Sequence, residues 1–327
     1  ESRAALVRLA ERLQAPLATT LRARGLFHGE SFNLGIFGTL SAPPAVDAIL
    51  RADCVIAFGA SLTTYTTSNG SFLQSKRVVQ VSASAADLGH CHVPDVALVG
   101  TARETVDAMI HWLDEAEIAP SGFTRELAGG ELTTRPIPPR GPIEASQLDF
   151  IETLTALNAM LPPDRIVAVD AGRFMIKTLE HIDVTEPRRM VHTASFGSIG
   201  LGMAYAIGAS IAEPERLVVL FVGDGGFMLG GLTEFNSAVR HGANLVVIVC
   251  NDGSYGAEHV QLRNKQMDPS LILFDWPDFA PIAQALGGRG VTVRTTSDLA
   301  VAAEEIRKGG KPLLIDLKLN PDRMPFH

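Results

Sequence analysis

Short apolar runs alternate with helical patterns through the first part of the chain. Residues 1–13 place leucine and alanine at a helical spacing between charged side chains, which predicts a helix. Strands that alternate with helices are typical of a parallel sheet with helices on its faces. The first part of the chain is predicted to contain helices at 1–13, 45–50 and 104–113 and strands at 16–20, 54–58 and 77–81.

The second part repeats this alternation with longer apolar runs. A helix predicted near 233–241 stops before Gly242, a residue that commonly ends helices. The same α/β pattern therefore predicts a second doubly wound domain with a parallel sheet. The expected helices are 147–160, 200–212, 233–241, 279–286 and 298–308, and the expected strands are 165–169, 217–222, 244–250, 291–293 and 312–317.

A segment rich in glycine and proline separates the two patterns. Gly129 and Gly130 precede four prolines, Pro136, Pro138, Pro139 and Pro142, which neither a helix nor a central strand sustains. We therefore expect two α/β domains, each a doubly wound parallel sheet. Their predicted bounds are 1–130 for the first domain, 131–145 for the linker and 146–327 for the second.

Composition narrows the classes of function. The net charge of -8 argues against a nucleic-acid binder, which would normally carry a basic stripe. The longest apolar runs are strand-sized, so no membrane span is expected, and the N-terminal residues do not resemble a signal peptide. Three scattered cysteines fit a reducing compartment, and a cytoplasmic location is expected.

Two polar motifs directly follow predicted strands of the second domain. Gly223-Asp224-Gly225-Gly226 follows the strand at 217–222, and Asn251-Asp252-Gly253 follows the strand at 244–250. Parallel sheets bind ligands just beyond the carboxyl ends of their strands. We therefore expect both motifs to lie at the functional edge of the sheet.

The residue types suit a hard divalent cation that holds a phosphate. Asp224 offers a carboxylate, Asn251 an amide carbonyl and Gly253 a backbone carbonyl, and Mg²⁺ prefers such oxygen ligands. The glycines beside Asp224 allow the backbone to approach a diphosphate. Either motif alone is also typical of an ordinary strand-to-helix turn. Their occurrence together on successive strands favours the metal site.

The motif set resembles that of the thiamine diphosphate (ThDP) enzymes, in particular acetolactate synthase, pyruvate decarboxylase and benzoylformate decarboxylase. Gly223-Asp224-Gly225, followed by Asn251 27 positions after the aspartate, is similar to the diphosphate motif of that family. The segments 10–20, 169–172, 196–200 and 278–280 also occur in the family's order. The resemblance implies a Rossmann-like central domain and a ThDP diphosphate-binding domain.

The resemblance also implies roles for individual residues. Asp224, Asn251 and the carbonyl of Gly253 match the Mg²⁺ ligands, and Gly225 and Gly226 match backbone that touches the diphosphate.

Other parts of the cofactor match a second motif. The carbonyl of Gly197 matches the acceptor for the aminopyrimidine amine, and Ile199 matches the apolar residue that bends the cofactor. Ser198 and Gly223 lie in the same two motifs and complete the predicted cofactor site. Tyr255 is predicted to line it, although a turn position with a partly exposed ring is equally plausible.

The family resemblance predicts an activity and partners. The cofactor serves as an electron sink for loss of CO₂ from a 2-oxo acid, so a decarboxylase or carboligase of the acetolactate synthase type is expected. The family's activating glutamate lies in an N-terminal pyrimidine-binding domain that this chain does not match. No catalytic residue is therefore assigned here, and that domain or subunit is an expected partner, with dimers or tetramers expected as the assembly.

Several weaker signals do not change this interpretation. His90-Cys91-His92 lacks a second ligand pair, and His192 and Cys250 are more typical of packing positions. The segment 58–62 resembles a dinucleotide site without a full glycine fingerprint, so FAD is not expected. The rival hypothesis is a non-catalytic subunit or a nucleotide-binding regulatory module that keeps the fold.

Overall fold

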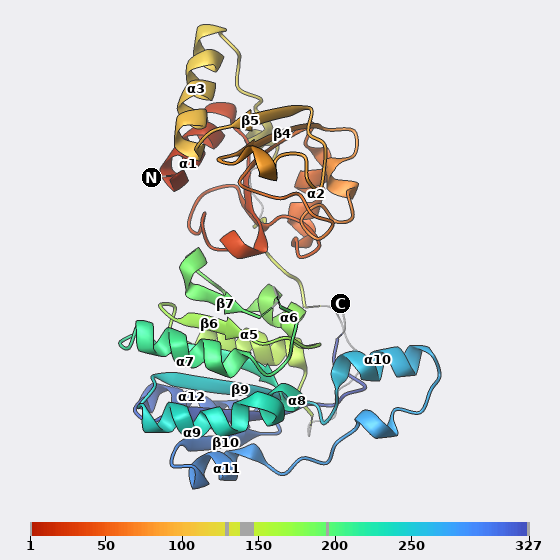
Figure 1. The fold of residues 1–327 in the computed structure, drawn as a ribbon, viewed down its shortest axis with the longest axis vertical. Coiled ribbons are helices and arrows are strands. Elements are labelled where there is room, and N and C mark those ends of the chain that lie inside the picture. The colour runs from red at the N-terminus through yellow and green to blue at the C-terminus, as the bar shows by residue number, and fades with distance from the viewer. Residues whose placement is uncertain (1, 128–130, 138–146, 194–195, 326–327) are drawn as a thin grey trace. The chain divides into compact units, whose positions relative to one another are not determined.

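The computed structural model describes residues 2–127, 131–137, 147–193 and 196–325. The chain divides into two compact units, Glu1–Pro136 and Ile137–His327 (Figure 1). The division falls inside the predicted linker, of which residues 138–145 lie outside the described part. Each unit is an α/β fold, and all strand pairs within its sheets are parallel, which confirms the predicted fold class.

Unit 1 distributes its strands between two small sheets. One pairs β1 with β2, and the other has the order β3-β4-β5. Helices α1 and α3 pack on each other through a small apolar cluster that includes Ala5, Leu9 and Val106. The elements are α1 (Ser2–Leu13), β1 (Leu17–Thr19), β2 (Asn33–Ile36), α2 (Pro43–Arg51), β3 (Cys54–Phe58), β4 (Arg77–Ser82), β5 (Val96–Val99), α3 (Ala102–Glu115) and α4 (Phe123–Glu126).

Unit 2 contains one six-stranded sheet of order β10-β11-β9-β8-β6-β7. Its elements occur at or near the predicted positions, with additional short elements between them. They are α5 (Phe150–Met160), β6 (Ile166–Val169), α6 (Met175–His181), β7 (Met190–His192), α7 (Gly202–Ala212), β8 (Val218–Gly223), α8 (Asp224–Gly226), α9 (Leu232–Arg240), β9 (Leu245–Asn251), α10 (Gly256–Asn264), α11 (Phe279–Ala285), β10 (Arg289–Val293), α12 (Asp298–Lys308) and β11 (Leu313–Lys318).

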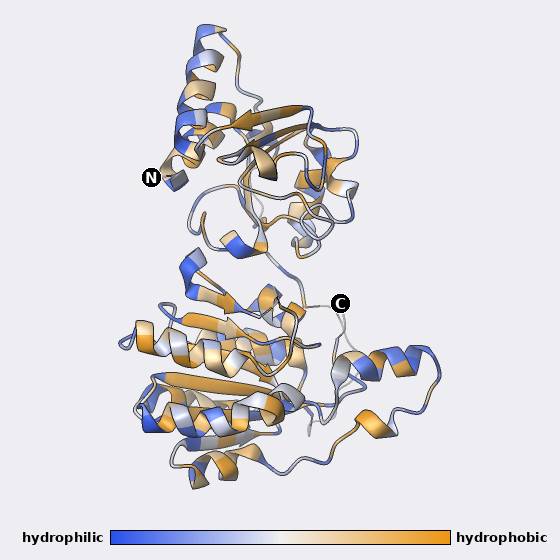
Figure 2. Cartoon of the chain, in the orientation of Figure 1, coloured by the Kyte–Doolittle hydropathy of each residue, from blue (hydrophilic) through white to orange (hydrophobic). Residues whose placement is uncertain are grey.

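Helices cover both faces of this sheet. The helices α7, α9 and α11 contribute side chains such as Met203, Phe235 and Phe279 to the apolar core on one face. On the other face α6 packs on β6, and α12 packs on β10 and β11. The central strands β8 and β9 are buried along nearly their whole length, and Figure 2 shows them as hydrophobic bands between helices with mixed surfaces. Burial on both faces explains why the apolar runs in the sequence are continuous rather than alternating.

Two helical segments, residues 224–231 and α10, were not predicted because glycines and polar residues interrupt their apolar pattern. The helix expected from residue 233 begins at Asp224 and passes through a π-helical turn, Phe227–Gly231, before it continues as α9. Four glycines in this stretch are poor helix formers, which is why periodicity missed its first two turns. Helix α10 has no apolar stripe of its own and was not predicted.

The order of strands fixes where a ligand can bind. The chain passes from β6 outward to β7, then returns to β8 on the other side of β6 and continues outward to β9. The connections therefore diverge between β6 and β8, and ligands of open α/β sheets bind at such a point, beyond the carboxyl ends of the strands. In the described part of the chain, no helix is both long and apolar enough to cross a membrane.

Candidate functional site

The predicted site residues lie at the carboxyl edge of the unit 2 sheet. Asp170 directly follows β6, Asp224 follows β8, and Asn251 ends β9. In the register of the sheet Gly223 pairs with Cys250. Asp224 and Asn251, each one residue further along, therefore leave neighbouring strands side by side. The two motifs that lie apart in sequence thus share one edge of the sheet.

Close backbone contacts bring the motif around Gly200 to the same place. A Cβ atom on Gly230 would lie 2.4 Å from the carbonyl oxygen of Gly200, and one on Gly226 would lie 2.7 Å from Asp170 Oδ2. Any side chain at these two positions would collide with fixed backbone or with a buried carboxylate. The glycines after Asp224 therefore let the start of this helix dock against the segment that contains Gly197, Ser198 and Ile199.

Asp170 holds this segment in place. Its Oδ2 accepts a hydrogen bond from the backbone N–H of Gly200 at 2.7 Å, and its Oδ1 accepts one from Gly202 at 3.2 Å. Thr193 Oγ1 donates a further hydrogen bond to Oδ1. Burial raises the pKa of Asp170, and these hydrogen bonds oppose the shift. The carboxylate is a buried clamp that fixes the loop carrying Gly197, whose φ of +78° requires a residue without a side chain.

Asp224 is a buried carboxylate next to a second buried carboxylate. It is 2% exposed, and burial together with the negative charge of Asp252 raises its pKa to about 7. Burial also raises the pKa of Asp252, whose Oδ1 accepts hydrogen bonds from the N–H and the hydroxyl of Ser254. Two buried carboxyl groups of like charge destabilise each other when ionised, and a bound divalent cation would relieve that repulsion.

The amide of Asn251 is oriented by its neighbour on β11. Its Nδ2 donates a hydrogen bond to Asp316 Oδ1 at 2.8 Å, while Asp316 Oδ2 accepts from the N–H of Phe279 and pairs with Lys318. The donor side of the amide is thereby committed to the protein. The carbonyl oxygen of Asn251 is the atom left for a cation, in agreement with the residue types expected of a Mg²⁺ site.

Gly253 and Tyr255 occupy the loop between β9 and α10. Gly253 has a φ of +65°, and its carbonyl oxygen accepts a hydrogen bond from the N–H of Phe274 at 2.7 Å. A carbonyl oxygen has a second lone pair, so this contact is compatible with a metal ligand. The ring of Tyr255 packs on Gly225, where a Cβ atom would lie 2.5 Å from Tyr255 Cε1. Gly225 therefore lacks a side chain because the tyrosine ring needs the space.

The donor set fits a single hard cation better than a softer metal. Among the described residues there is no group of three or more His, Cys, Asp or Glu side chains that could hold a metal. The predicted set combines only one carboxylate with two carbonyl oxygens. Proteins usually bind Mg²⁺ through one or two carboxylates together with phosphate oxygens and water, so a set with one carboxylate suits Mg²⁺ with a bound diphosphate.

Sequence reasoning missed several residues that shape the site. Asp252 and Asp316 are fully or almost fully buried, and Trp276 Nε1 donates a hydrogen bond to Asp224 Oδ2 at 2.9 Å. Asp252 had a visible signal, because it stands between two predicted metal ligands. Asp316 and Trp276 lie 65 and 52 positions from their partners, so no local pattern could connect them.

The weaker sequence signals lie apart from the site or serve packing. Cys250 is buried on β9, and burial raises the pKa of its thiol, which keeps it protonated. His192 ends β7, and His90 and Cys91 are exposed in unit 1.

Comparisons with known proteins identify the family. The model of the thiamine pyrophosphate enzyme central domain matches residues 1–109, and that of the C-terminal TPP-binding domain matches residues 170–317. Similar curated proteins include the acetolactate synthase of Mycobacterium leprae, 27% identical over 96% of this chain and 52% of that protein. The pyruvate oxidase of Lactiplantibacillus plantarum is 26% identical over 97% of this chain and 53% of its own length. A third relative, "Probable 2-ketoarginine decarboxylase AruI" of Pseudomonas aeruginosa, is 26% identical over 93% of this chain and 53% of its own length.

The chain spans about half the length of these relatives. The two family models match in the order expected of such enzymes, one in each unit of the structure. The second match contains Asp170, the segment around Gly197, Asp224 and Asn251, which the fold gathers at one edge of the sheet. The chain belongs to the thiamine pyrophosphate enzyme family and carries its central and C-terminal TPP-binding domains.

Proposed function

We propose that this chain is the central and diphosphate-binding portion of a ThDP- and Mg²⁺-dependent decarboxylase or carboligase that acts on a 2-oxo acid. The observation that carries the proposal is the pair Asp224 and Asn251, which lie side by side at the carboxyl ends of β8 and β9, next to the switch point between β6 and β8. Asp224 is buried beside Asp252, and its one side-chain hydrogen bond within the described residues comes from Trp276. A site that only held the fold would not require a buried carboxylate in this electrostatic setting.

Each proposed contact uses an atom of this chain. Asp224, the Asn251 carbonyl and the Gly253 carbonyl would hold Mg²⁺, and the backbone of Gly225 and Gly226 would face the diphosphate. The N–H groups of both glycines lie in the first turn of a helix, where backbone N–H groups favour an anion. The Gly223 turn places Asp224 at the start of the helix.

The remaining contacts concern the rings of the cofactor. The Gly197 carbonyl would accept the aminopyrimidine amine, with Ser198 beside it and Ile199 as the apolar wedge. The Asp170 clamp keeps this loop fixed, and Tyr255 closes one side of the site. When bound, ThDP supplies an electron sink for the loss of CO₂.

The substrate class follows from chemistry shared by the relatives. The names of two of them refer to pyruvate and to 2-ketoarginine, both 2-oxo acids. We propose the same class for this chain.

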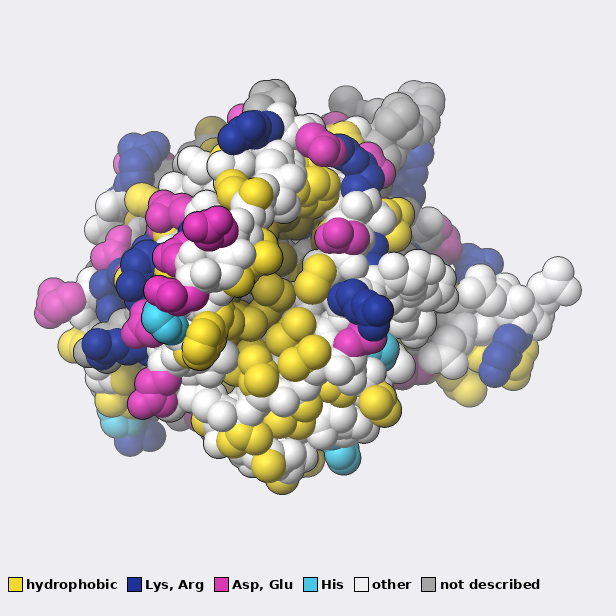
Figure 3. Space-filling model, turned by 90° about the horizontal axis from the view of Figure 1, so that it is seen from above, with side chains coloured by type: hydrophobic (Ala, Val, Ile, Leu, Met, Phe, Trp, Pro, Cys, Tyr) yellow, Lys and Arg dark blue, Asp and Glu magenta, His cyan; other side chains and the backbone are white. Residues whose placement is uncertain are grey.

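The proposed enzyme needs a pyrimidine-binding part that these residues do not match. Because the chain spans about half of its relatives, we propose that a pyrimidine-binding domain or subunit supplies the activating glutamate and that the assembly is a dimer or tetramer. Exposed apolar residues support contacts with partners. Val96 and Val99 lie exposed on the edge strand β5, and Figure 3 shows hydrophobic side chains gathered on a face of unit 1.

The first experiment is native mass spectrometry of the chain with ThDP and MgCl₂, followed by isothermal titration calorimetry. We expect one ThDP and one Mg²⁺ per chain and loss of ThDP binding in EDTA. Turnover of 2-oxo acids is then assayed with and without an N-terminal half from an acetolactate synthase. Binding without turnover in any combination would favour the non-catalytic module. The absence of ThDP binding both in the chain alone and in the chain with the N-terminal half would contradict the proposal.

A further inference from the structure

A short segment of unit 2 that belongs to neither motif pairs with the loop that contains Gly253. Residues 272–276 run antiparallel to residues 253–255, with a β-bridge between Ser254 and Leu273. The N–H of Tyr255 donates to the carbonyl of Ile272 at 3.0 Å, and the N–H of Phe274 donates to the carbonyl of Gly253 at 2.7 Å. We call residues 272–276 the cap segment.

Three aromatic rings lie in contact, Phe274 and Trp276 of the cap segment and Tyr255 beside them. Tyr255 meets Phe274 edge-on with ring centroids 4.9 Å apart, and Phe274 stacks on Trp276 with centroids 4.7 Å apart and an interplanar angle of 21°. Trp276 also packs against the apolar core of unit 2. Stacking on Phe274 and packing against the core restrain the indole ring, so its N–H points in a defined direction.

That N–H donates to the carboxylate proposed as the metal ligand. Trp276 Nε1 lies 2.9 Å from Asp224 Oδ2, and among the described residues it is the one side chain that hydrogen-bonds to Asp224. An indole N–H is a donor without acceptor capacity, so it cannot itself bind a cation. It therefore takes one lone pair of Oδ2 and restrains the rotation of the carboxylate together with a hydrogen bond from the backbone of Gly225.

We propose that Trp276 is a positioning residue for Asp224, fixing the carboxylate so that its remaining lone pairs face Mg²⁺. The inference rests on the proposed function. Donors of this kind orient metal ligands in other proteins, and their loss typically weakens metal binding by about 10–100-fold. The aromatic stack also links Tyr255, over Gly225, to the carboxylate, so both sides of the site are held by one element.

The test compares two matched variants of the full chain. Trp276→Phe keeps an aromatic ring and removes the N–H, and Trp112→Phe makes the same change at an exposed position in unit 1. Titration calorimetry with MgCl₂ at saturating ThDP should show about 10–100-fold weaker Mg²⁺ binding for Trp276→Phe alone. Melting temperatures in EDTA separate this effect from a loss of stability.

A second measurement leaves Trp276 in place. The chain has two tryptophans, so in Trp112→Phe all indole fluorescence comes from Trp276. Its emission should change with Mg²⁺ in the presence of ThDP and saturate at the dissociation constant found by calorimetry. Asp224→Asn should abolish that response.

The outcomes separate this inference from the proposed function. If the wild-type chain binds Mg²⁺ and ThDP but Trp276→Phe binds Mg²⁺ equally well, the role of Trp276 is overturned and the function stands. If Mg²⁺ binds but does not change the emission of Trp276, the role of Trp276 is likewise overturned and the proposed function stands. If the wild-type chain binds neither, the proposed function fails and the role of Trp276 fails with it.

Discussion

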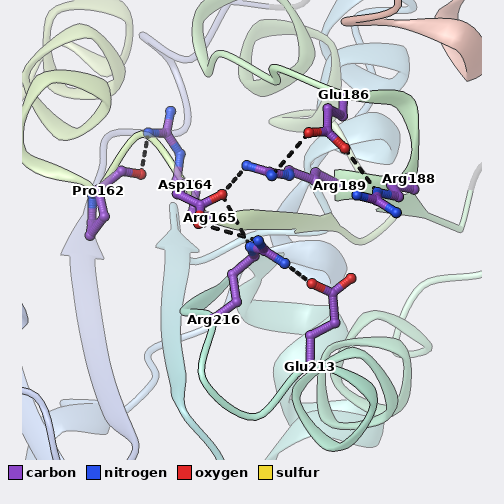
Figure 4. Close-up of polar contacts among 8 residues, drawn as sticks. All are labelled: Pro162, Asp164, Arg165, Glu186, Arg188, Arg189, Glu213 and Arg216. Carbon is purple, nitrogen blue, oxygen red and sulfur yellow. Dashed lines mark hydrogen bonds and ion pairs between the residues drawn. The ribbon is translucent and has the colours of Figure 1, made fainter.

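Carboxyl groups at the two edges of the unit 2 sheet have opposite surroundings, exposed and paired with arginine at one edge and buried beside another carboxyl group at the other. At the amino edge, Asp164 precedes β6 and pairs with Arg189 and Arg216, while Glu213 pairs with Arg216 (Figure 4). Asp164 is exposed, and a hydrogen bond from Arg216 lowers its pKa. At the carboxyl edge, Asp224 is buried, lies beside another carboxylate, and has a raised pKa.

This difference makes the carboxyl edge, and not the amino edge, the candidate for binding a cation. Arginines satisfy the acidic groups at the amino edge, so those groups need no ligand. At the carboxyl edge the fold keeps Asp224 and Asp252 buried without a full complement of positive charge. Strongly raised carboxyl pKa values in such a setting are typical of functional sites.

The largest expected effect comes from removing the proposed metal ligand. Asp224→Ala should weaken Mg²⁺-dependent ThDP binding by roughly a hundredfold or more, because a direct ligand matters at least as much as its supporting contacts. Titration calorimetry measures the loss. Asp164→Ala, the control at the other edge, should bind as the wild type does, and undiminished affinity in Asp224→Ala would refute the metal assignment.

The next effect is a pH dependence of stability in the absence of metal. The pKa of Asp224 is about 7 in the folded chain and about 3.8 in the unfolded chain. Between these values the folded state binds more protons at Asp224, so the contribution of Asp224 to the free energy of unfolding should fall by about 3 kcal/mol as pH rises from 4 to 7. Urea unfolding in EDTA at a series of pH values measures this slope.

Three comparisons sharpen that experiment. Asp224→Asn should make the fall between pH 4 and 7 shallower, while Asp252 and Asp170, whose pKa values are also raised, continue to contribute to it. Excess MgCl₂ with ThDP should restore stability at pH 8. The contribution of Asp164 to the free energy of unfolding should rise with pH, opposite to that of Asp224, because the pKa of Asp164 is lowered in the folded chain. Its stabilisation is present above its unfolded pKa and is lost as pH falls through the folded value. An equal slope in wild type and Asp224→Asn would contradict the buried, raised-pKa description of Asp224.

A smaller effect concerns the close approach of backbone at the carboxyl edge. Gly226→Ala would place a Cβ atom 2.7 Å from Asp170 Oδ2, so we expect it to lower the free energy of unfolding by about 1–3 kcal/mol. Gly208 is exposed on α7, and a Cβ atom added there would have no other atom within 4 Å. Gly208→Ala should therefore raise stability by up to about 1 kcal/mol. Chemical denaturation compares them, and equal stability of the two variants would argue against the tight contact.

The smallest effect is expected at the amino edge. Asp164→Ala removes ion pairs of an exposed carboxylate with Arg189 and Arg216, and such pairs contribute little because water and salt screen them. We expect the melting temperature to fall by roughly a degree or two, and less in high salt. A large loss of stability, or any loss of ThDP binding, would show that the two edges are not independent.

Much of the fold and of the site could be predicted from local pattern. The strand at Cys54–Phe58 and the helix at Asp298–Lys308 have the predicted bounds, because each is one uninterrupted apolar run or stripe. Asp224 and Asn251 stood out because each directly follows such a run. Helix α10 and the helical turns at 224–231 were not predicted, since contacts elsewhere in the chain hold them rather than their own periodicity.

The sequence by itself determined the α/β class, the family and the identity of the candidate ligands, because these depend on short segments that fold or bind through their own residue types. The tertiary structure alone decided which groups act on those ligands. Burial and then the charge of Asp252 raise the pKa of Asp224, Asp316 orients the amide of Asn251, and Trp276 donates to Asp224 across 52 positions of sequence. Electrostatic and hydrogen-bond interactions depend on distance in space, and residues distant in sequence come within that distance only when the sheet and its loops have closed around them.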